Sequence, residues 1–353
     1  MKVKIHTGNS INELHKLLIT GKPVFAIIDD SLQHLAEHFR QFPLYFFKSS
    51  EKKKTLESVV GIAQWLLEQG ADRNSLVLGV GGGITTDVTG FAASIYKRGV
   101  KFAFVPTTLL AQVDASIGGK NGVNLLSYKN ILGTITQPEW IFICPQLLAT
   151  LPENEFKAGI AEVLKAFILF DKEYYRKAVG YFAAIAPKDG ETYGAAAVGL
   201  DGSLLAEIIG KCAKYKSEVV ERDEFERGER RMLNLGHTFA HSIEKLAGGE
   251  ISHGYAVSMG MVLAAKFADV LCVAREGFTQ MLINDLRSVG LPALLEDCPL
   301  TANFKPGDLA EAVGKDKKVT GNSIRFILPK GLQEVEDIQI PLDKIKEIAD
   351  DLR

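Results

Sequence analysis

The first part of the chain alternates short, continuous apolar runs with segments of helical periodicity. The apolar runs lie at residues 24–28, 44–47, 76–80 and 102–105, and helical patterns at 31–39 and 55–69 separate some of them. Strands without an alternating polar face are buried on both sides, as in a parallel sheet that helices cover. The pattern therefore predicts an α/β domain whose ligands bind beyond the carboxyl ends of the strands.

After about residue 150 the pattern becomes mostly helical. It predicts helices at residues 155–166, 211–220 and 255–268, and a hairpin at 319–328 about a Thr-Gly-Asn-Ser turn. The segment 181–202, rich in Gly and Ala, is expected to be a surface insertion. We therefore predict two consecutive domains, an α/β domain at residues 1–152 and a mostly α-helical domain at residues 153–353.

Composition and charge argue against several classes of function. The 353 residues are 46% hydrophobic and 24% charged, with a formal net charge of −2, which gives no general attraction to nucleic acid or anionic membranes. The four cysteines are far apart in the sequence, which indicates a reducing compartment and no thiolate metal site. The first residues have the pattern of a strand and not of a signal peptide, and Lys266 and Asp269 interrupt the most apolar segment. We expect a cytoplasmic protein without a membrane span.

A glycine-rich turn follows the third apolar run. From Gly79 to Asp87 the chain reads Gly-Val-Gly-Gly-Gly-Ile-Thr-Thr-Asp, and such a strand-to-helix turn lets backbone N–H groups approach a pyrophosphate. Ile84 stands where the dinucleotide fingerprint needs its last glycine, so a tight turn without a ligand is the alternative. Asp87 either interacts with the helix dipole near the start of the helix or is an acid that faces the ribose or a metal. Two further loops rich in hydrogen-bond donors favour the ligand, and they carry Thr107, Thr108, Lys120, Lys129 and Asn130.

Three of the seven histidines fall in one short window of the second half. His237 and His241 are four residues apart and share a helix face, and His253 follows a loop. Imidazole is the commonest protein ligand of transition metals, and a catalytic zinc site typically has three protein ligands and an open position. The alternative is a pair of surface histidines. Glu162, three residues before Lys165, is either half of a surface ion pair or a carboxylate metal ligand. A metal beside a dinucleotide suggests oxidation of an alcohol.

Taken together, these segments resemble the 3-dehydroquinate synthase family of the sugar-phosphate cyclase superfamily over essentially the whole chain. The resemblance is carried by an ordered series of motifs at residues 51–57, 81–87, 98–99, 106–110, 114–120, 129–130, 159–165, 233–241, 253–254 and 316–318.

The resemblance implies a Rossmann-like N-terminal domain and a mostly helical C-terminal domain, in a homodimer to which the partner subunit contributes an arginine. It implies a lyase that converts 3-deoxy-D-arabino-heptulosonate 7-phosphate to 3-dehydroquinate and phosphate, the second step of the shikimate pathway to chorismate and aromatic amino acids. NAD would be used catalytically through transient oxidation, β-elimination of phosphate, re-reduction and intramolecular aldol closure. One divalent metal, zinc or cobalt, completes the cofactors.

The resemblance also implies roles for individual residues. The metal ligands would be Glu162, His237 and His253, which moves His241 from the metal to the substrate side. The catalytic groups would be Lys165, Lys216, Asn234 and His241, and the substrate would contact Arg98, Lys120, Asn130, Arg230, Lys317 and Lys318. The NAD contacts would be Glu51, Lys54, Gly82, Gly83, Asp87, Thr107, Thr108, Asp114, Lys120, Lys129 and Thr150.

The chain departs from the family pattern at Tyr255, where many relatives carry Glu, and in the glycine turn after Gly83. The alternatives are another cyclase, of the 2-deoxy-scyllo-inosose or epi-valiolone synthase type, and a metal-dependent polyol dehydrogenase that would release NADH. A non-catalytic nucleotide-binding regulator would not need to keep Glu162, His237 and His253 together. Lys216, Asn234 and Arg230 suit a carboxylate-bearing substrate and favour dehydroquinate synthase.

Overall fold

The computed structural model describes residues 3–19, 21–126, 128–185, 187–188, 190–314 and 321–348. The chain divides into two compact units, each made of two segments. Unit 1 consists of Met1–Pro152 and Pro187–Phe225, and unit 2 of Glu153–Ala186 and Glu226–Arg353. Each unit is described by itself.

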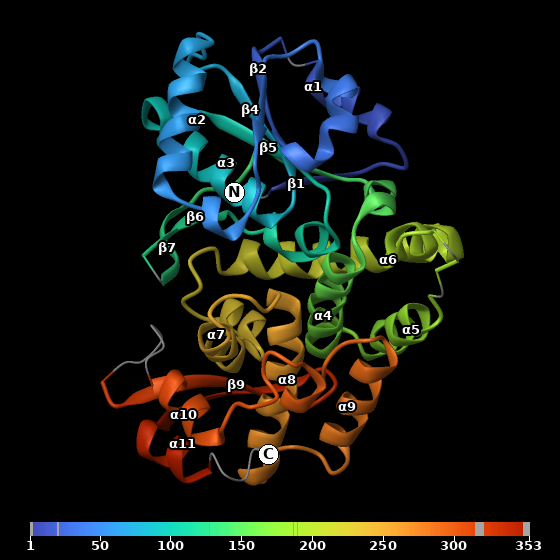
Figure 1. Ribbon diagram of the computed structural model, residues 1–353, viewed down its shortest axis with the longest axis vertical. Helices are drawn as coiled ribbons and strands as arrows, with labels where there is room; N and C mark the ends of the chain where they lie inside the picture. The colour runs from blue at the N-terminus through green and yellow to red at the C-terminus, as the bar shows by residue number, and fades with distance from the viewer. Residues whose placement is uncertain are drawn as a thin grey trace. The chain divides into compact units, whose positions relative to one another are not determined.

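The core of unit 1 is a six-stranded parallel sheet of order β1-β8-β5-β4-β2-β3 (Figure 1). Its strands are β1 (Lys4–Thr7), β2 (Val24–Asp29), β3 (Leu44–Phe47), β4 (Leu76–Gly81), β5 (Lys101–Pro106) and β8 (Trp140–Ile143). The four apolar runs of the sequence all fall in these strands, and β4 is buried at every position. The predicted parallel α/β architecture is therefore confirmed.

Helices and short helical turns connect the strands of this sheet. The connecting elements are η1 (Ile11–Leu14), α1 (His15–Leu18), η2 (Asp30–Phe39), η3 (Glu51–Lys53), α2 (Leu56–Glu68), α3 (Gly83–Ile95), η4 (Tyr96–Arg98) and η5 (Ala111–Ala115), and η6 (Pro145–Thr150) follows β8. Helix α3 packs closely on β4 because β4 carries glycines there. A Cβ built on Gly81 would lie 2.7 Å from the side chain of Thr85. The helix that follows the glycine turn is thus fixed against its strand.

Unit 1 also contains a two-stranded antiparallel ribbon, β6 (Lys120–Leu125) and β7 (Tyr128–Ile135), and the long helix α6 (Tyr193–Arg222). Helix α6 packs against η5 and η6. The units therefore differ from the two consecutive domains predicted from the sequence, because residues 187–225 belong to unit 1. The expected surface insertion at 181–202 is also wrong in part: Tyr181 and Ala197 are buried, and much of the segment is helical.

Unit 2 is built around α8 (His253–Val270), most of whose residues are buried. The other helical elements are α4 (Glu153–Phe170), α5 (Lys172–Ala183), η7 (Glu229–Asn234), α7 (His237–Leu246), α9 (Phe278–Ser288), η8 (Leu295–Asp297), α10 (Pro306–Gly314) and α11 (Leu342–Ile348). Helix α8 packs on α4, α7, α9 and β9, and a cluster of Phe239, Phe267 and Phe326 joins α7, α8 and β9 with ring centroids 5.1–6.1 Å apart.

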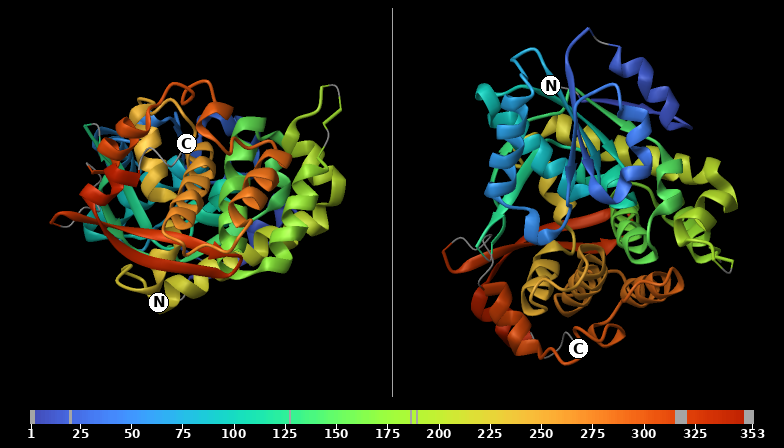
Figure 2. Two further views of the ribbon diagram at one scale, coloured as in Figure 1. Left: turned by 90° about the horizontal axis from the view of Figure 1, so that it is seen from below. Right: turned by 45° about the horizontal axis from the view of Figure 1, so that its top comes forward.

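The hairpin of unit 2 lies later in the chain than predicted. Its strands are β9 (Ser323–Gly331) and β10 (Glu334–Pro341), seen as a long red ribbon beside α8 in Figure 2. The chain reverses at Leu332 and Gln333, and residues 323–328 run through one strand. The predicted second run, residues 323–328, is therefore a strand, whereas the predicted Thr-Gly-Asn-Ser turn begins at Thr320 and its first run lies before it, outside the described residues. None of the described helices has the length and apolar character required to span a membrane.

Candidate metal centre and nucleotide-binding loops

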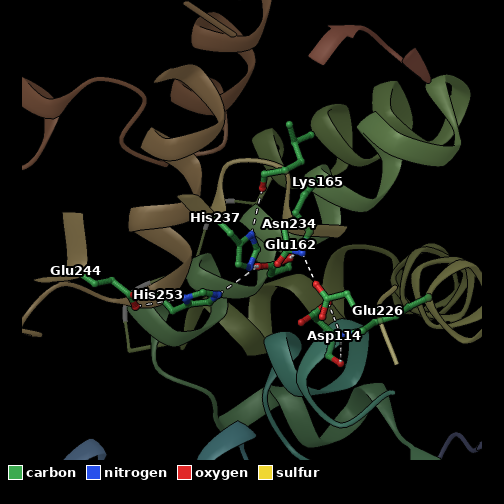
Figure 3. A network of polar contacts seen from close by, with 10 residues as sticks. Asp114, Glu162, Lys165, Glu226, Asn234, His237, Glu244 and His253 are labelled. Carbon is green, nitrogen blue, oxygen red and sulfur yellow. Dashed lines mark hydrogen bonds and ion pairs between the residues drawn. The ribbon is translucent and has the colours of Figure 1, made fainter. Parts of the chain in front are cut away.

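One carboxylate and two imidazoles come together in unit 2 (Figure 3). Glu162 lies in the middle of α4, whereas His237 and His253 are the first residues of α7 and α8. The Nε2 atoms of His237 and His253 lie 3.6 and 3.4 Å from Oε1 of Glu162. One ligand atom from each residue lies within 4.8 Å of the others. A carboxylate and two imidazoles are typical protein ligands of a catalytic zinc or cobalt site.

Close helix packing brings these residues together. A Cβ on Gly254 would lie 2.1 Å from the carbonyl oxygen of Ala158, which is one turn before Glu162 on α4. A Cβ on Gly260 would lie 2.3 Å from the carbonyl oxygen of Gly236, the residue before His237. The start of α8 can therefore approach α4, and its middle can approach the start of α7, only because glycine stands at both positions.

The charges of the site fit a cation. Glu162 and Lys165 are both buried and form an ion pair, yet neither carboxylate oxygen of Glu162 accepts a hydrogen bond of good geometry from a described residue. Burial lowers the pKa of His253, but the nearby carboxylates of Glu162 and Glu244 outweigh burial and raise the pKa above its ordinary value. The two carboxylates thus favour a positive charge at His253, and a metal ion between Nε2 and Glu162 would take the place of the proton there.

The other predicted residues of unit 2 lie around the triad. His241 follows one turn after His237 on α7, with ring centroids 5.7 Å apart. Asn234 lies at the end of η7 and donates a hydrogen bond from its Nδ2 to Glu226, and Arg230 on η7 is buried. Lys317 and Lys318 lie outside the described residues.

Two acids of unit 2 were missed in the sequence. Glu226 accepts the hydrogen bond of Asn234, and Glu244 lies 3.3 Å from Nδ1 of His253. A signal for Glu244 was present, because it stands seven residues after His237 on the same helix face. No local signal pointed to Glu226, since its pairing depends on the path of the loop before η7.

In unit 1, the glycine turn leads directly into α3. Gly82 is the N-cap residue of α3, and no side chain caps that helix. Asp87, on the second turn, is ion-paired with Lys54 at 2.6 Å. Burial raises the pKa of Asp87 above its ordinary value, although the ammonium of Lys54 acts in the opposite direction. The glycine turn at Gly82 and Gly83 is thus followed, one helical turn on, by an acid whose partner is the buried Lys54.

The remaining predicted nucleotide residues of unit 1 lie on several loops. Thr107 follows β5 and its N–H donates to the carbonyl of Gly81 at 3.0 Å, which joins two strand ends. Asn124 links two more of these loops: its Nδ2 donates to Glu51 at 2.7 Å, and its Oδ1 accepts from the Asn130 N–H at 2.9 Å.

Lys216 belongs to unit 1 as well. Its ammonium contacts both the carboxylate and the carbonyl oxygen of Asp114 at 2.7 Å. The sequence-based division had placed Lys216 in the second domain with the metal ligands. The other predicted residues of unit 1 are placed as follows: Thr108 after β5, Lys120 and Lys129 on the β6–β7 ribbon, Thr150 at the end of η6, and Arg98 at the end of η4.

Comparison with known proteins assigns the family. The model of the 3-dehydroquinate synthase N-terminal region matches residues 44–158, and that of the C-terminal region matches residues 159–319. A 3-dehydroquinate synthase of Prochlorococcus marinus (strain MIT 9515) is 38% identical over 94% of this chain and 87% of its own length. The chain belongs to the 3-dehydroquinate synthase family. Another member, from Thermococcus kodakarensis, is 40% identical over 86% of this chain and 80% of its own.

Solved structures related to the family have the same fold. The 2-epi-5-epi-valiolone synthase of Streptomyces hygroscopicus, with NAD+ and Zn2+ bound, superposes with a TM-score of 0.86 at 25% identity, over 99% of this chain and 96% of its own. A 2-deoxy-scyllo-inosose synthase complexed with carbaglucose-6-phosphate, NAD+ and Co2+ gives 0.81 at 25% identity, over 99% and 98%. A probable glycerol dehydrogenase of Sinorhizobium meliloti, at 16% identity over 99% and 96%, has a TM-score of 0.65 and shares the fold alone.

Proposed function

We propose that the protein is an NAD- and metal-dependent 3-dehydroquinate synthase that converts 3-deoxy-D-arabino-heptulosonate 7-phosphate to 3-dehydroquinate and phosphate. The observation that carries the proposal is the cluster of Glu162, His237 and His253 in a chain of this family. A non-catalytic regulator would have no reason to gather a buried carboxylate and two imidazoles within ligand distance of one another, because burying polar groups costs free energy.

In this proposal the two cofactors have separate places. Glu162, His237 and His253 hold one divalent ion, zinc or cobalt, in unit 2. NAD binds at the loops of unit 1, at Glu51, Lys54, Gly82, Gly83, Asp87, Thr107, Thr108, Asp114, Lys120, Lys129 and Thr150. When bound, NAD accepts and returns a hydride, and the metal acts as a Lewis acid on substrate oxygens. The N-terminus of α3, which no side chain caps, favours the pyrophosphate.

The chain's own cations hold the anionic substrate. Lys165 is buried beside Glu162, so its ammonium lies where an anionic substrate group would approach the metal. Lys216, Asn234 and His241 are the other catalytic groups, and Arg98, Lys120, Asn130, Arg230, Lys317 and Lys318 hold the phosphate and the carboxylate. The leaving phosphate takes the proton released in the elimination, so no side chain need act as a dedicated base. The protein mainly positions the substrate and neutralises its negative charges.

We further propose a homodimer in which the β6–β7 ribbon forms part of the interface. The ribbon exposes large apolar side chains in the single chain: Leu125, Leu126, Tyr128, Ile131 and Ile135 are 39–90% exposed. Several large apolar side chains exposed on one short ribbon are typical of a contact with another protein. The covering protein in this proposal is a second copy of the chain.

Arg98 is the arginine that we propose reaches the partner's site. It is exposed and has a positive φ of 70°, in a row with Lys97 at 48° and Gly99 at 107°. Such backbone strain in non-glycine residues is concentrated at functional sites. A hydrogen bond of 2.8 Å between Ser94 and Thr134 ties the preceding end of α3 to the ribbon. Arg230, by contrast, is buried within the chain.

The first test of the proposed function compares the amount of phosphate released with the amount of NADH that accumulates. The metal-loaded protein is incubated with heptulosonate 7-phosphate and substoichiometric NAD. Many phosphates per NAD, without lasting absorbance of NADH, are expected. NADH that accumulates one for one with product would identify a dehydrogenase. Turnover of glucose 6-phosphate or sedoheptulose 7-phosphate alone would keep the cofactors and transfer the substrate assignment to the related cyclases.

The second test asks whether Arg98 acts across the dimer. The variants Arg98→Ala and Glu162→Gln are each expected to be inactive. A mixed dimer contains one site with an intact metal triad and an intact arginine, so refolding the two together should restore about a quarter of the parent activity. If the mixture stays inactive while it forms dimers, Arg98 does not act in trans.

A further inference from the structure

A buried carboxylate behind the triad has no role in the proposed mechanism. Glu244 lies near the end of α7 and is 4% exposed. Its Oε1 lies 3.3 Å from Nδ1 of His253, on the side of the ring opposite to Glu162 (Figure 3). We propose that Glu244 is a positioning residue that fixes the tautomer and orientation of His253, so that Nε2 presents its lone pair to the metal. This inference rests on the proposed metal site.

The chain path accounts for the contact. Glu244 follows His237 by seven residues on one face of α7, and a loop containing Gly248 and Gly249, with φ of 62° and 79°, turns the chain into α8. The first residue of α8 is His253. One helix therefore supplies both a metal ligand and the acid that supports the other imidazole.

The geometry determines which nitrogen carries the proton. An ionised carboxylate only accepts hydrogen bonds, so a neutral His253 beside Glu244 keeps its proton on Nδ1. Nε2 is then left with a lone pair that points toward Glu162. A carboxylate behind a ligand histidine raises its basicity and fixes its ring in many metal sites.

The two imidazoles of the site are supported differently. Nδ1 of His237 lies 3.2 Å from the carbonyl oxygen of Leu235, a backbone group that a side-chain substitution does not remove. His253 is the more exposed ring, with 33% of its side chain accessible against 13% for His237, and it has a side chain behind it. The orientation of His253 is thus the one that depends on a replaceable group.

Tyr255 does not replace this acid. It stands where the family pattern leads one to expect an acid near His253, but its hydroxyl donates to Oδ1 of Asn154 at 3.3 Å. The carboxylate that contacts His253 comes from α7 instead, at Glu244. The departure at Tyr255 therefore leaves the metal ligand supported.

The test measures binding of Co2+ alone by competition with a chromophoric chelator. The variants are Glu244→Ala, Glu244→Gln and the control Glu250→Gln, which replaces an exposed residue in the loop between α7 and α8. We expect Glu244→Ala to bind Co2+ ten- to a hundredfold more weakly than the parent. Glu244→Gln keeps an oxygen acceptor and should lie between the two, and Glu250→Gln should match the parent. Equal affinity of Glu244→Ala and the parent would overturn the inference.

Two controls separate positioning from folding and from the metal site itself. Imidazole 15N spectra of Zn2+-loaded, histidine-labelled protein should show the Nδ1–H tautomer of His253 in the parent, and a changed His253 signal in Glu244→Gln although that variant melts like the parent. An unchanged signal contradicts the inference. His253→Ala should lose Co2+ binding, and the proposed metal site is wrong if this variant still binds Co2+. If His253→Ala loses Co2+ binding but Glu244→Ala binds Co2+ like the parent, the metal site stands and only the role of Glu244 is wrong.

Discussion

The close approach of α8 to α4 can be tested at a single methyl group. In Gly254→Ala the added Cβ would lie 2.1 Å from the carbonyl oxygen and 2.4 Å from the Cα of Ala158. Cβ atoms essentially never come within 3.0 Å of another heavy atom, so the start of α8 must move by about 0.9 Å. Both atoms of Ala158 belong to the backbone of a buried helix and cannot swing away as a side chain would. Overpacking of this kind costs about 1–3 kcal/mol.

The same displacement moves His253, the residue before Gly254, relative to Glu162. We therefore expect Gly254→Ala to lower the melting temperature by roughly 5 °C, for a loss of about 2 kcal/mol, and to weaken Co2+ binding at least tenfold, since metal sites require ligands within a few tenths of an ångström. Scanning calorimetry without metal and chelator competition with Co2+ measure the two effects.

A matched control is Gly210→Ala on α6, where an added Cβ meets nothing within 4 Å. This variant should be unchanged or up to about 1 kcal/mol more stable, because alanine favours a helix over glycine. If Gly254→Ala melts and binds Co2+ like the parent, the packing of α8 on α4 does not position His253, and the reasoning is wrong.

Three further predictions concern other contacts. Lys54→Met leaves the half-buried Asp87 without its ammonium partner, so we expect a loss of about 2 kcal/mol in stability and weaker NAD binding by titration calorimetry. Unchanged NAD affinity would remove Lys54 from the nucleotide site. The guanidinium of Arg287 lowers the pKa of Asp297 to about 2, so this pair adds stability above the pKa of about 3.9 in the unfolded chain and loses it as the pH falls to 2. Asp297→Asn should then cost on the order of 1 kcal/mol of unfolding free energy at pH 7, seen as a lower melting temperature, and should leave the melting temperature unchanged at pH 2. Ile131→Lys on the exposed ribbon should convert dimer to monomer in light scattering, and a dimer that persists would exclude the ribbon from the interface.

The sheet of unit 1 could be predicted because its signal is local. A strand buried on both faces must be apolar throughout, and β2, β4 and β5 are continuous apolar runs between helices. The hairpin of unit 2 could not be placed in the same way. A Thr-Gly-Asn-Ser segment favours a turn wherever it stands, but whether the chain reverses there depends on where the partner strand can pair. The reversal at Leu332 and Gln333, where Gln333 has a φ of 66°, directly follows Gly331, so the sequence offers turn residues at both places and does not decide between them.

The division into units was missed for a related reason. Helix α6 follows α5 in the sequence, but it packs against η5 and η6, which precede α4. A Cβ on Gly194, near the start of α6, would lie 1.9 Å from the carbonyl oxygen of Leu148 in η6. The composition of the segment looked like that of a surface insertion because small residues permit such contact and also occur in loops. Only the contact itself distinguishes the two.

The spacing of the histidines in the sequence predicts only part of the metal triad. Four-residue spacing placed His237 and His241 on one helix face, and they do lie together, with ring centroids 5.7 Å apart. Yet the carboxylate that faces both His237 and His253 comes from Glu162, on a different helix, and no periodicity within α7 points to it. Gly254 is in contact with α4 next to His253, and Gly260 with α7 next to His237. Ligands at the starts of two helices can converge on the middle of a third only if backbones touch, so the glycines beside the histidines, more than the histidine spacing, determine the shape of this site.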